Sequence, residues 1–385
     1  MLIVFVPLIV TTLVFIVETL LGAIPARGSG APLAAFDPSR VVVLVPAHDE
    51  EQGIAAILQQ QRAAMPPGMR LLVVADNCTD RTADLARAAG AEVIERYDTA
   101  LRGKGHALDF GRASLAASPP DCVIVVDADT VPAGDSLARL AARAIAEHRP
   151  IQAAYFMVTG EASTSVARFS ALAFFVKNVV RGLGASRLGA PTMLSGSGMA
   201  FPWRIFATLP LATGHVAEDL MLGVQCSEAG VAPRFEPAAS VSGRTSSDRG
   251  TAVQRKRWES GFFQVAQDSA LPLIAQGIRR ARPGLVWLGL ELATPPLILL
   301  LSLDAVAVAI AGLGWLLGMG AAPFWVMAIL PSIAVLAIVV ALAGHRRLDM
   351  LRDWTAIPRY IVWKLGLTIK TLVRREHRWI RTDRD

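Results

Sequence analysis

Apolar positions dominate both ends of the chain, whereas the middle alternates short apolar runs with polar stretches. Residues 2–24 carry a single charge, Glu18, and form a stretch long enough to span a bilayer. No basic residue precedes Arg27, so this segment lacks the basic start of a signal peptide, and we expect a retained transmembrane helix. Residues 25–39 are rich in Pro, Gly and Ser and are expected to be a linker.

Short runs of β-branched residues recur in the middle of the chain. They are RVVVLVPAHDEE from Arg40, MRLLVVADNCTD from Met69 and DCVIVVDADT from Asp121. The intervening helical stretches are 50–64, 80–89 and 104–117. Continuous apolar runs of this kind are typical of buried parallel strands, and their alternation with helices predicts an α/β, Rossmann-like domain over residues 40–270. The polar residues that end each run should then lie at the ligand-binding edge of the sheet.

Apolar character returns after about Gly284. An interfacial or broken helix, interrupted by Pro295 and Pro296, is expected within residues 271–301, followed by two transmembrane helices within 302–344. Residues 345–385 form a basic tail with an amphipathic stretch suited to the membrane surface. The positive-inside rule places this tail and the middle domain in the cytoplasm, so we expect a multi-pass protein of the inner membrane, in contact with membrane lipids.

Charge and cysteine content narrow the class of protein further. The net charge is +6. In a membrane protein, such an excess of basic residues marks segments that face the cytoplasm and contact anionic lipids. No basic run in the middle domain is interleaved with stacking aromatic residues, so we expect no nucleic-acid partner. The three cysteines lack metal-ligand spacing, which predicts reduced thiols rather than a disulfide scaffold.

Carboxylates follow two of the predicted strands. Asp127 and Asp129 leave a strand end with one residue between them, and a divalent cation bridging to a substrate phosphate would compensate their charge. Mg²⁺ or Mn²⁺ suits such oxygen ligands, although an isolated pair of this form is also common in turns and helix caps. Asp76 follows the preceding strand, where it can accept hydrogen bonds from a base or ribose, or form an Asx-type turn.

Small residues and charges mark three further stretches. Lys104 stands between glycines at a helix start, which suits a phosphate but also an ordinary loop. The run 195–198 leaves room for a sugar or acceptor against the backbone, or forms a flexible turn. Glu218 and Asp219 begin a helix, either as first-turn acids favoured by the helix dipole or with one of them as a general base. No P-loop or strand-linked GxGxxG motif is present.

The stretch QRKRWESG, residues 254–261, places a tryptophan among cations. Taken in order, these motifs are Asp76, the triplet 127–129, the pair 218–219, and Gln254 with Arg257 and Trp258. The series resembles the D, DxD, D, QxxRW signature of membrane-embedded glycosyltransferase family two enzymes, which include cellulose, chitin and hyaluronan synthases. The resemblance covers residues from about 40 to 267 and implies a cytosolic GT-A fold with flanking transmembrane helices.

The resemblance also implies a role for each residue that matches the signature. The nucleotide-binding residues would be Asp76, Asp49, Lys104, Asp127, Gln254 and Arg257, with Asp49 standing where the family often has asparagine. Asp127 and Asp129 would hold Mg²⁺ or Mn²⁺, and Asp219 would be the catalytic base. The acceptor-binding residues would be Trp258, beneath the acceptor sugar, with Glu218, Gly196 and Ser197.

The implied reaction is an inverting transfer from a nucleotide sugar, expected to be a UDP-sugar. QxxRW in this family points to processive synthesis of a β-linked polysaccharide, coupled to export through the spans and to export partner proteins. The alternative is addition of one sugar to a lipid or lipid-linked acceptor, because two later spans make a small channel for one subunit. A third reading is a catalytically inactive, nucleotide-binding membrane scaffold, against which the intact acidic residues argue.

Overall fold

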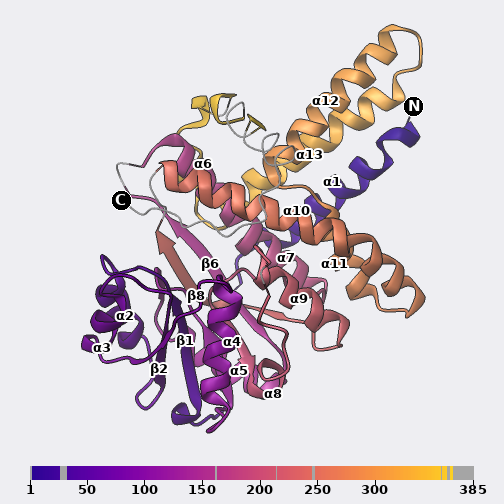
Figure 1. Ribbon diagram of the computed structural model, residues 1–385. Coiled ribbons are helices and arrows are strands. Elements are labelled where there is room, and N and C mark those ends of the chain that lie inside the picture. The colour runs from indigo at the N-terminus through magenta and orange to yellow at the C-terminus, as the bar shows by residue number, and fades with distance from the viewer. Residues whose placement is uncertain are drawn as a thin grey trace.

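We describe the protein from a computed structural model that covers residues 2–26, 33–160, 163–213, 215–244, 248–356, 358–361 and 365–366. Side chains are described for these residues except 244 and 248–256. An α/β domain carries a group of apolar helices that project from one side of it, and the N-terminus lies near the far tip of that group (Figure 1). The predicted amphipathic tail lies almost wholly outside the described residues.

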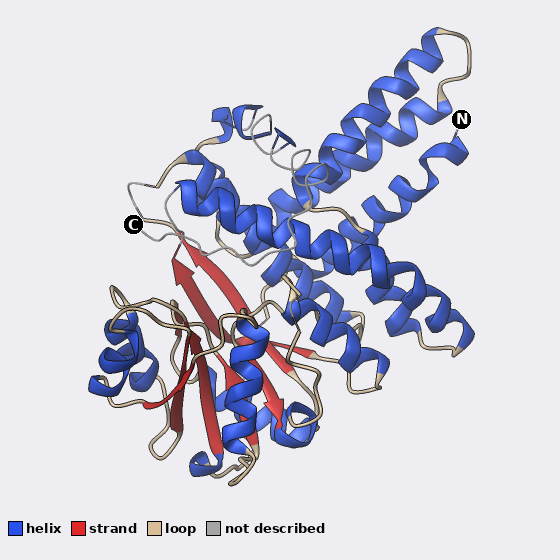
Figure 2. Ribbon diagram, viewed as in Figure 1, coloured by secondary structure: helices blue, strands red, loops and turns tan. Residues whose placement is uncertain are grey.

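The α/β domain is built on a mixed sheet (Figure 2). Its strands are β1 (Val41–Ala47), β2 (Arg70–Asp76), β3 (Glu92–Arg96), β4 (Cys122–Val125), β5 (Thr130–Pro132), β6 (Ile151–Val158), β7 (Met199–Pro202) and β8 (Arg234–Arg244). Their order in the sheet is β3-β2-β1-β4-β7-β6-β8-β5. The first four strands are parallel, as the sequence predicts. Beyond them the sheet is not parallel throughout, as the alternation of strands and helices would predict, because β7 pairs antiparallel with both β4 and β6.

Helices cover both faces of the sheet. Those of the α/β domain are α2 (Ile54–Ala63), α3 (Thr82–Ala88), α4 (Lys104–Leu115), α5 (Ser136–Glu147), α8 (Trp203–Phe206) and α9 (Glu218–Glu228). In β1, Val43 packs with α2 and α5, whereas its neighbour Leu44 packs with α4 on the other face. A strand buried on both faces needs a continuous apolar run, which is why β1, β2 and β4 could be recognised in the sequence.

A second group of helices joins this domain to the apolar spans. They are α6 (Ser165–Phe175), the π-helical segment η2 (Val176–Arg181), α7 (Gly182–Arg187), α10 (Asp248–Arg279) and α11 (Pro283–Ala293). Helix α10 runs continuously through residue 270, where the sequence predicts the end of the α/β domain. Leu273 of α10 and Leu288 of α11 are buried in one apolar cluster, so these helices pack against each other.

Three helices among the described residues are long and apolar enough to cross a membrane, namely α1 (Leu2–Gly22), α12 (Leu297–Leu316) and α13 (Ala322–Gly344). Phe5 of α1, Ala307 of α12 and Met327 of α13 share a buried cluster, so the three helices lie together. Helix α12 starts at Leu297, directly after Pro296, and so begins earlier than the predicted position 302. Proline fits the start of a helix because it has no backbone N–H to leave unpaired.

Helix α1 is fixed to the rest of the protein by its C-terminal half. The Glu18 carboxylate accepts hydrogen bonds from Arg181 Nε and from Trp287 Nε1, each at 2.7 Å. A Cβ added at Gly184 of α7 would lie 1.9 Å from the Glu18 carbonyl oxygen, so the two backbones are in contact. Glu18 is fully buried. Its ion pair with Arg181 compensates a carboxylate charge that would otherwise be unpaired in an apolar environment.

Candidate active site

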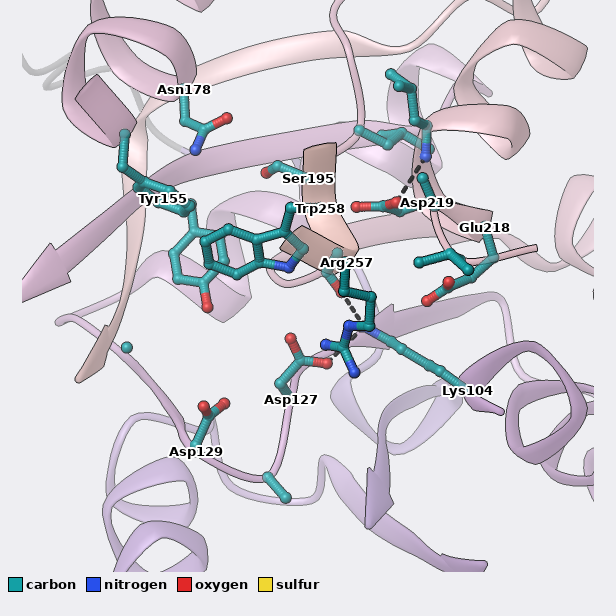
Figure 3. Close-up of a pocket in the computed structure, with 18 of the residues that line it drawn as sticks. Lys104, Asp127, Asp129, Tyr155, Asn178, Ser195, Glu218, Asp219, Arg257 and Trp258 are labelled. Atoms are coloured by element: carbon teal, nitrogen blue, oxygen red, sulfur yellow. Dashed lines mark hydrogen bonds and ion pairs between the residues drawn. The ribbon is translucent and has the colours of Figure 1, made fainter. Parts of the chain in front are cut away.

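A cavity of about 1260 Å³ opens at the carboxyl ends of the parallel strands (Figure 3). The predicted site residues that line it are Asp49, Asp76, Lys104, Asp127, Asp129, Gly196, Glu218, Asp219, Arg257 and Trp258. Ser197, expected beside the acceptor, is fully buried and lies outside this lining. The side chain of Gln254 lies outside the described residues. Ten residues from separated motifs therefore meet in one cavity, at the edge where ligands bind in such sheets.

Asp76 lies at the end of β2 and is 6% exposed. Its Oδ1 accepts from Arg96 at 2.7 Å and from the Asn77 amide at 3.0 Å. Burial raises the pKa of Asp76, and the Arg96 guanidinium opposes that rise. Both contacts use the same oxygen, so Oδ2 keeps its capacity to accept a hydrogen bond from a ligand in the cavity.

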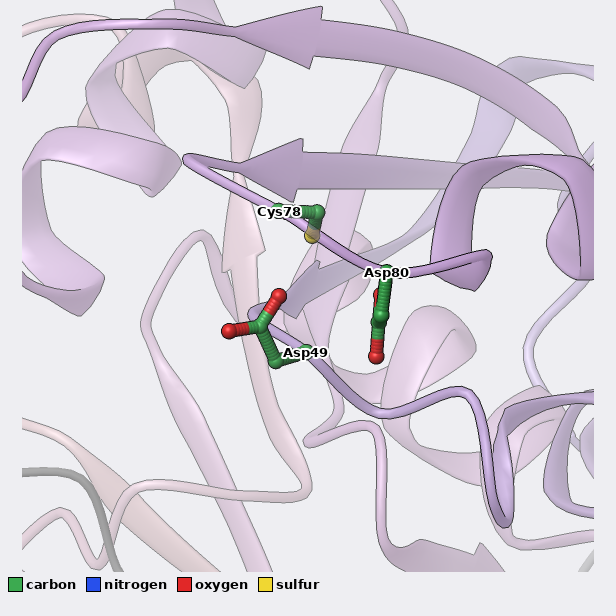
Figure 4. Close-up of side chains that lie close together, drawn as sticks. All are labelled: Asp49, Cys78 and Asp80. Carbon is green, nitrogen blue, oxygen red and sulfur yellow. The ribbon is translucent and has the colours of Figure 1, made fainter.

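Asp49 lies close to Cys78 and Asp80 at the neighbouring strand ends (Figure 4). One ligand atom from each residue falls within 4.8 Å of the others, which is a spacing that a metal ion could use. Asp49 already accepts the backbone N–H of Thr79 at 2.7 Å, and Asp80 accepts that of Thr82 at 2.9 Å. Burial raises the pKa of the Cys78 thiol to about 11, which disfavours the thiolate that metals bind. The two backbone hydrogen bonds explain why Asp49 and Asp80 lie here, because each carboxylate caps a loop.

The pair Asp127 and Asp129 begins directly after β4. The Lys104 ammonium lies 2.5 Å from Asp127 Oδ1 and also donates to the Gly196 carbonyl oxygen. The backbone N–H of Asp127 donates to Ser197 Oγ at 3.0 Å, so buried Ser197 supports the strand end. Asp129 accepts from the Thr130 hydroxyl at 3.2 Å. Thus a cation already neutralises the first carboxylate of the pair.

This donor set fits a divalent cation. Two carboxylates on one cavity wall provide the hard oxygen ligands that Mg²⁺ and Mn²⁺ take, and the cavity leaves the remaining coordination positions to a substrate phosphate. Lys104 begins α4, where the helix N-terminus adds a further preference for an anion. The ammonium that now holds Asp127 is therefore also placed to contact a diphosphate.

Glu218 and Asp219 occupy the first turn of α9. Asp219 Oδ1 accepts the backbone N–H of Leu220 at 2.8 Å. Its Oδ2 lies so close to Gly196 that a Cβ added there would be 3.2 Å away. Gly196 also has a φ of +88°, a conformation that L side chains rarely adopt. A side chain at this position would enter the space that the Asp219 carboxylate and the Lys104 ammonium share, so glycine keeps that space open.

Glu218 at the start of α9 and Lys104 at the start of α4 both have shifted pKa values. Burial and the neighbouring Asp219 raise the pKa of Glu218 to about 7, against the lowering effects of Lys104 and Arg257. Burial lowers the pKa of Lys104, but Asp127, with the acids of α9, more than offsets it, so the net shift is upward. Lys104 is therefore charged at neutral pH, and Glu218 is poised between its two forms. Perturbed groups of this kind in a cavity are typical of functional sites.

Arg257 and Trp258 reach the cavity from α10, and Figure 3 shows both side chains pointing into it. The Trp258 ring lies 5.7 Å from that of Phe174, which meets Tyr155 edge-on at 5.0 Å. These three rings form an aromatic wall on the cavity. Such a wall offers an apolar face of the kind on which a sugar ring can lie.

Several residues of the cavity wall were not predicted from the sequence. Tyr155, Phe174, Lys177, Arg181 and Glu291 all line it. Lys177, Arg181 and Glu291 could have been noticed in the sequence, because each of these charges interrupts a mainly apolar stretch that the structure shows as helical. No such signal marks the two aromatic residues, because aromatic side chains in apolar runs usually belong to a core.

Comparison with known proteins gives the following matches. The family model described as Glycosyltransferase like family 2 matches residues 38–261. An uncharacterized glycosyltransferase of Mycobacterium tuberculosis is 42% identical over 96 residues, which are 25% of this chain and 39% of that protein. A probable glycosyltransferase of Bacillus subtilis is 37% identical over 105 residues, 24% of this chain and 23% of that protein. The matched stretch thus spans well under half of these curated relatives.

Two solved structures are similar at low identity. One is a mannosyltransferase from Pyrobaculum calidifontis in complex with GDP-Man and Mn²⁺, with a TM-score of 0.48, 20% identity, and coverage of 81% of this chain and 91% of that chain. The other is glucosyl-3-phosphoglycerate synthase from Mycobacterium tuberculosis, in complex with Mn²⁺, UDP-glucose and phosphoglyceric acid. Its TM-score is 0.39, with 22% identity and coverage of 57% and 77%.

Proposed function

The chain belongs to the glycosyltransferase family 2-like proteins, and from this premise we propose that it transfers a sugar from a nucleotide sugar to an acceptor hydroxyl. The observation that carries the proposal is the meeting of Lys104, Asp127 and Asp219 around Gly196. A carboxylate that can take a proton and a cation that can hold a leaving diphosphate both lie within 4 Å of the point that a side chain at Gly196 would occupy. That is the pair of functions that glycosyl transfer requires.

The nucleotide sugar is proposed to lie across the strand ends. Asp76 and Asp49 would accept hydrogen bonds from the nucleoside, which the sequence resemblance suggests is uridine. Lys104 and Arg257 would hold the diphosphate, since both are cations on the cavity wall. The sequence resemblance gives Gln254 a part in binding the same nucleotide. Asp127 and Asp129 would hold Mg²⁺ or Mn²⁺, which supplies charge stabilisation to the departing diphosphate when it is bound.

Asp219 is proposed as the general base. It accepts the proton of the acceptor hydroxyl as that oxygen forms a bond to the anomeric carbon and the bond from that carbon to the diphosphate breaks. A single displacement inverts the anomeric centre, so an α-linked donor gives a β-linked product. The aromatic wall formed by Tyr155, Phe174 and Trp258 would hold the acceptor, with Glu218 and Gly196 beside it. Lys104 and Arg257 stabilise the charge that develops on the leaving group.

We place the α/β domain in the cytoplasm, with α1, α12 and α13 crossing the inner membrane and the N-terminus outside. Resemblance to the polymer synthases favours a processive β-linked product and export through the spans with partner proteins. The second candidate is single transfer to a lipid acceptor. It is favoured by one observation, that the cavity lining includes Phe15 of α1 and Leu297 of α12. An inactive scaffold would need no carboxylate beside Gly196, so we place it last.

The test uses membranes that contain the full chain and a panel of radiolabelled UDP-sugars and GDP-sugars. We expect the release of nucleoside diphosphate from one of these donors, and we expect Asp219→Asn to abolish transfer while donor affinity stays the same. A lost general base reduces rates by about 10²–10⁴-fold. Asp268→Asn is the matched control, because Asp268 is exposed on α10. Wild-type turnover by Asp219→Asn would remove this residue from the proposed role.

A further inference from the structure

The cavity continues beyond the aromatic wall to the base of the apolar spans. There it is lined by Phe15 of α1, by Pro295 and Pro296, and by Leu297 and Ile298 at the start of α12. Phe15 and Leu297 belong to helices that are long and apolar enough to cross a membrane. One end of the cavity therefore carries the catalytic carboxylates, and the other end is apolar and formed by candidate membrane spans.

Between these two ends lie buried polar atoms that have no hydrogen-bond partner among the described residues. They are Arg181 Nη2, Glu291 Oε2, Ser170 Oγ and Ser195 Oγ. All four residues line the cavity, and Arg181, Glu291 and Ser170 are 7%, 5% and 0% exposed. A buried polar group without a partner costs about 1–3 kcal/mol, so native proteins rarely keep several together without a ligand.

Segment η2 explains how two of the cations reach this place. A π-helical turn widens the helix, and such turns often occur at functional sites. Here it brings Lys177, Asn178 and Arg181 to the cavity wall. The Lys177 ammonium lies 5.4 Å from the centre of the Phe262 ring and is exposed to the cavity. The cavity keeps the Lys177 ammonium away from bulk water, which lowers its pKa, and Asp219, the proposed base, opposes that effect.

The charges in this part of the cavity do not favour an anionic ligand. Lys177 and Arg181 are accompanied by the carboxylates of Glu18, Asp219 and Glu291, and electrostatic interactions link them. Even with Glu291 protonated, Glu18 and Asp219 match the two cations. The unpartnered atoms include a guanidinium donor, a carboxyl oxygen and hydroxyls, which are complementary to a head group that both donates and accepts hydrogen bonds.

We propose that Arg181, Glu291 and Ser195 form a binding site for the uncharged, hydroxyl-bearing head group of a membrane lipid, which is the sugar acceptor. The lipid tails would leave the cavity past Phe15 and Leu297 into the bilayer. The head-group hydroxyl then lies between this site and Asp219, which takes its proton. This inference rests on the proposed glycosyl transfer and favours its second candidate, single transfer to a lipid, over the synthesis of a polymer.

The test reconstitutes the full chain in phosphatidylcholine nanodiscs, because phosphatidylcholine has no free hydroxyl. Bacterial lipids are separated by anion exchange into an uncharged and an acidic fraction, and each is added with the radiolabelled donor that the protein turns over. A soluble oligosaccharide is the third acceptor. We expect label in an organic-soluble, uncharged product with the uncharged fraction alone. Label in acidic lipid, in oligosaccharide or in an insoluble polymer would overturn the lipid-acceptor proposal.

Variants then connect the product to the site. We expect Glu291→Leu to raise the KM for the active lipid fraction by about tenfold or more, the effect of one lost hydrogen bond to a charged group. Glu291→Gln keeps an acceptor oxygen and should restore much of the affinity. Glu228→Gln, on the exposed end of α9, is the control and should match the wild type. An unchanged KM in Glu291→Leu with a wild-type melting curve would contradict the site.

The two proposals fail in different ways. If no nucleotide sugar is hydrolysed or transferred with any acceptor, glycosyl transfer itself is wrong. If a donor is turned over and the sugar appears in a product other than an uncharged lipid, only the acceptor class is wrong. Release of nucleoside diphosphate and the partition of the label are measured in the same reaction, so each failure is recognised directly.

Discussion

Replacing Glu218 by glutamine should change how stability depends on pH. Burial and Asp219 raise the pKa of Glu218 from 4.5 to about 7 in the folded protein. Between these values the folded chain keeps a proton that the unfolded chain has lost. The stability that Glu218 contributes is therefore fully present below about pH 4.5 and is lost as the pH rises through about 7.

The size of the effect follows from the size of the pKa shift. The change from 4.5 to about 7 is about 2.5 units, and each unit corresponds to about 1.4 kcal/mol. The wild type should thus lose about 3 kcal/mol of this contribution between pH 4.5 and pH 8. Glutamine has nearly the same shape and does not titrate, so Glu218→Gln should gain this amount relative to the wild type over the same interval.

Melting curves of the purified protein at pH 5, 6, 7 and 8 measure the effect. The difference in Tm between Glu218→Gln and the wild type should grow in favour of the variant as the pH rises. Glu228→Gln removes an exposed carboxylate from the same helix and should shift Tm equally at every pH. Two parallel pH profiles for Glu218→Gln and the wild type would refute the reasoning, because they would show that Glu218 titrates at the same pH in both states.

Three further outcomes are expected. Chelation of divalent cations should stop transfer, and Asp129→Asn should raise the Mn²⁺ concentration needed for half-maximal activity by about tenfold or more; full activity in excess chelator would contradict the metal site. Trp258→Ala should reduce transfer with little change in UDP affinity; a joint loss of UDP affinity and Tm, restored by Trp258→Phe, would make it a packing residue. Gly184→Ala should lower stability by about 1–3 kcal/mol, since its Cβ would lie 1.9 Å from a carbonyl oxygen. Gly53→Ala, which meets nothing within 4 Å, is its control, and equal Tm values in the two would refute the close contact.

The parallel half of the sheet could be predicted because its determinants are local. Strands β1, β2 and β4 are continuous apolar runs, and Lys104 marks the start of α4 as expected. The other half, in which parallel and antiparallel pairs are mixed, was not predicted. Strand β7 has only four residues, and its partners lie about 50 and 80 residues earlier in the chain. In a strand so short, the pattern of apolar and polar residues is too brief to indicate the direction of the strand or its neighbours.

In the cavity, too, the sequence predicted the residues of local motifs but not the contacts between distant parts of the chain. The DxD pair predicted a metal and phosphate site, and the acids that begin α9 predicted a general base or a helix start. The side chains of both motifs line one cavity. The Lys104 contact with the Gly196 carbonyl oxygen joins residues 92 positions apart, so it has no signature in sequence spacing. Likewise Asp76 is held by Arg96, a partner that becomes adjacent only when β2 and β3 pair. Tertiary pairing decides which of the many possible cation–carboxylate contacts forms.

The contact of Glu18 with Arg181 and Trp287 bears on how the protein is assembled. Helix α1 is synthesised first, but the partners of Glu18 lie 163 and 269 residues later in the chain. At a translation rate of about 5–20 residues per second, α1 waits for roughly 10 s or more before both partners exist. During that time its carboxylate lacks the Arg181 guanidinium that pairs with it in the folded protein. Helix α1 is therefore made well before its partners and docks late, and closing this long loop is a slow step that other folding events must precede.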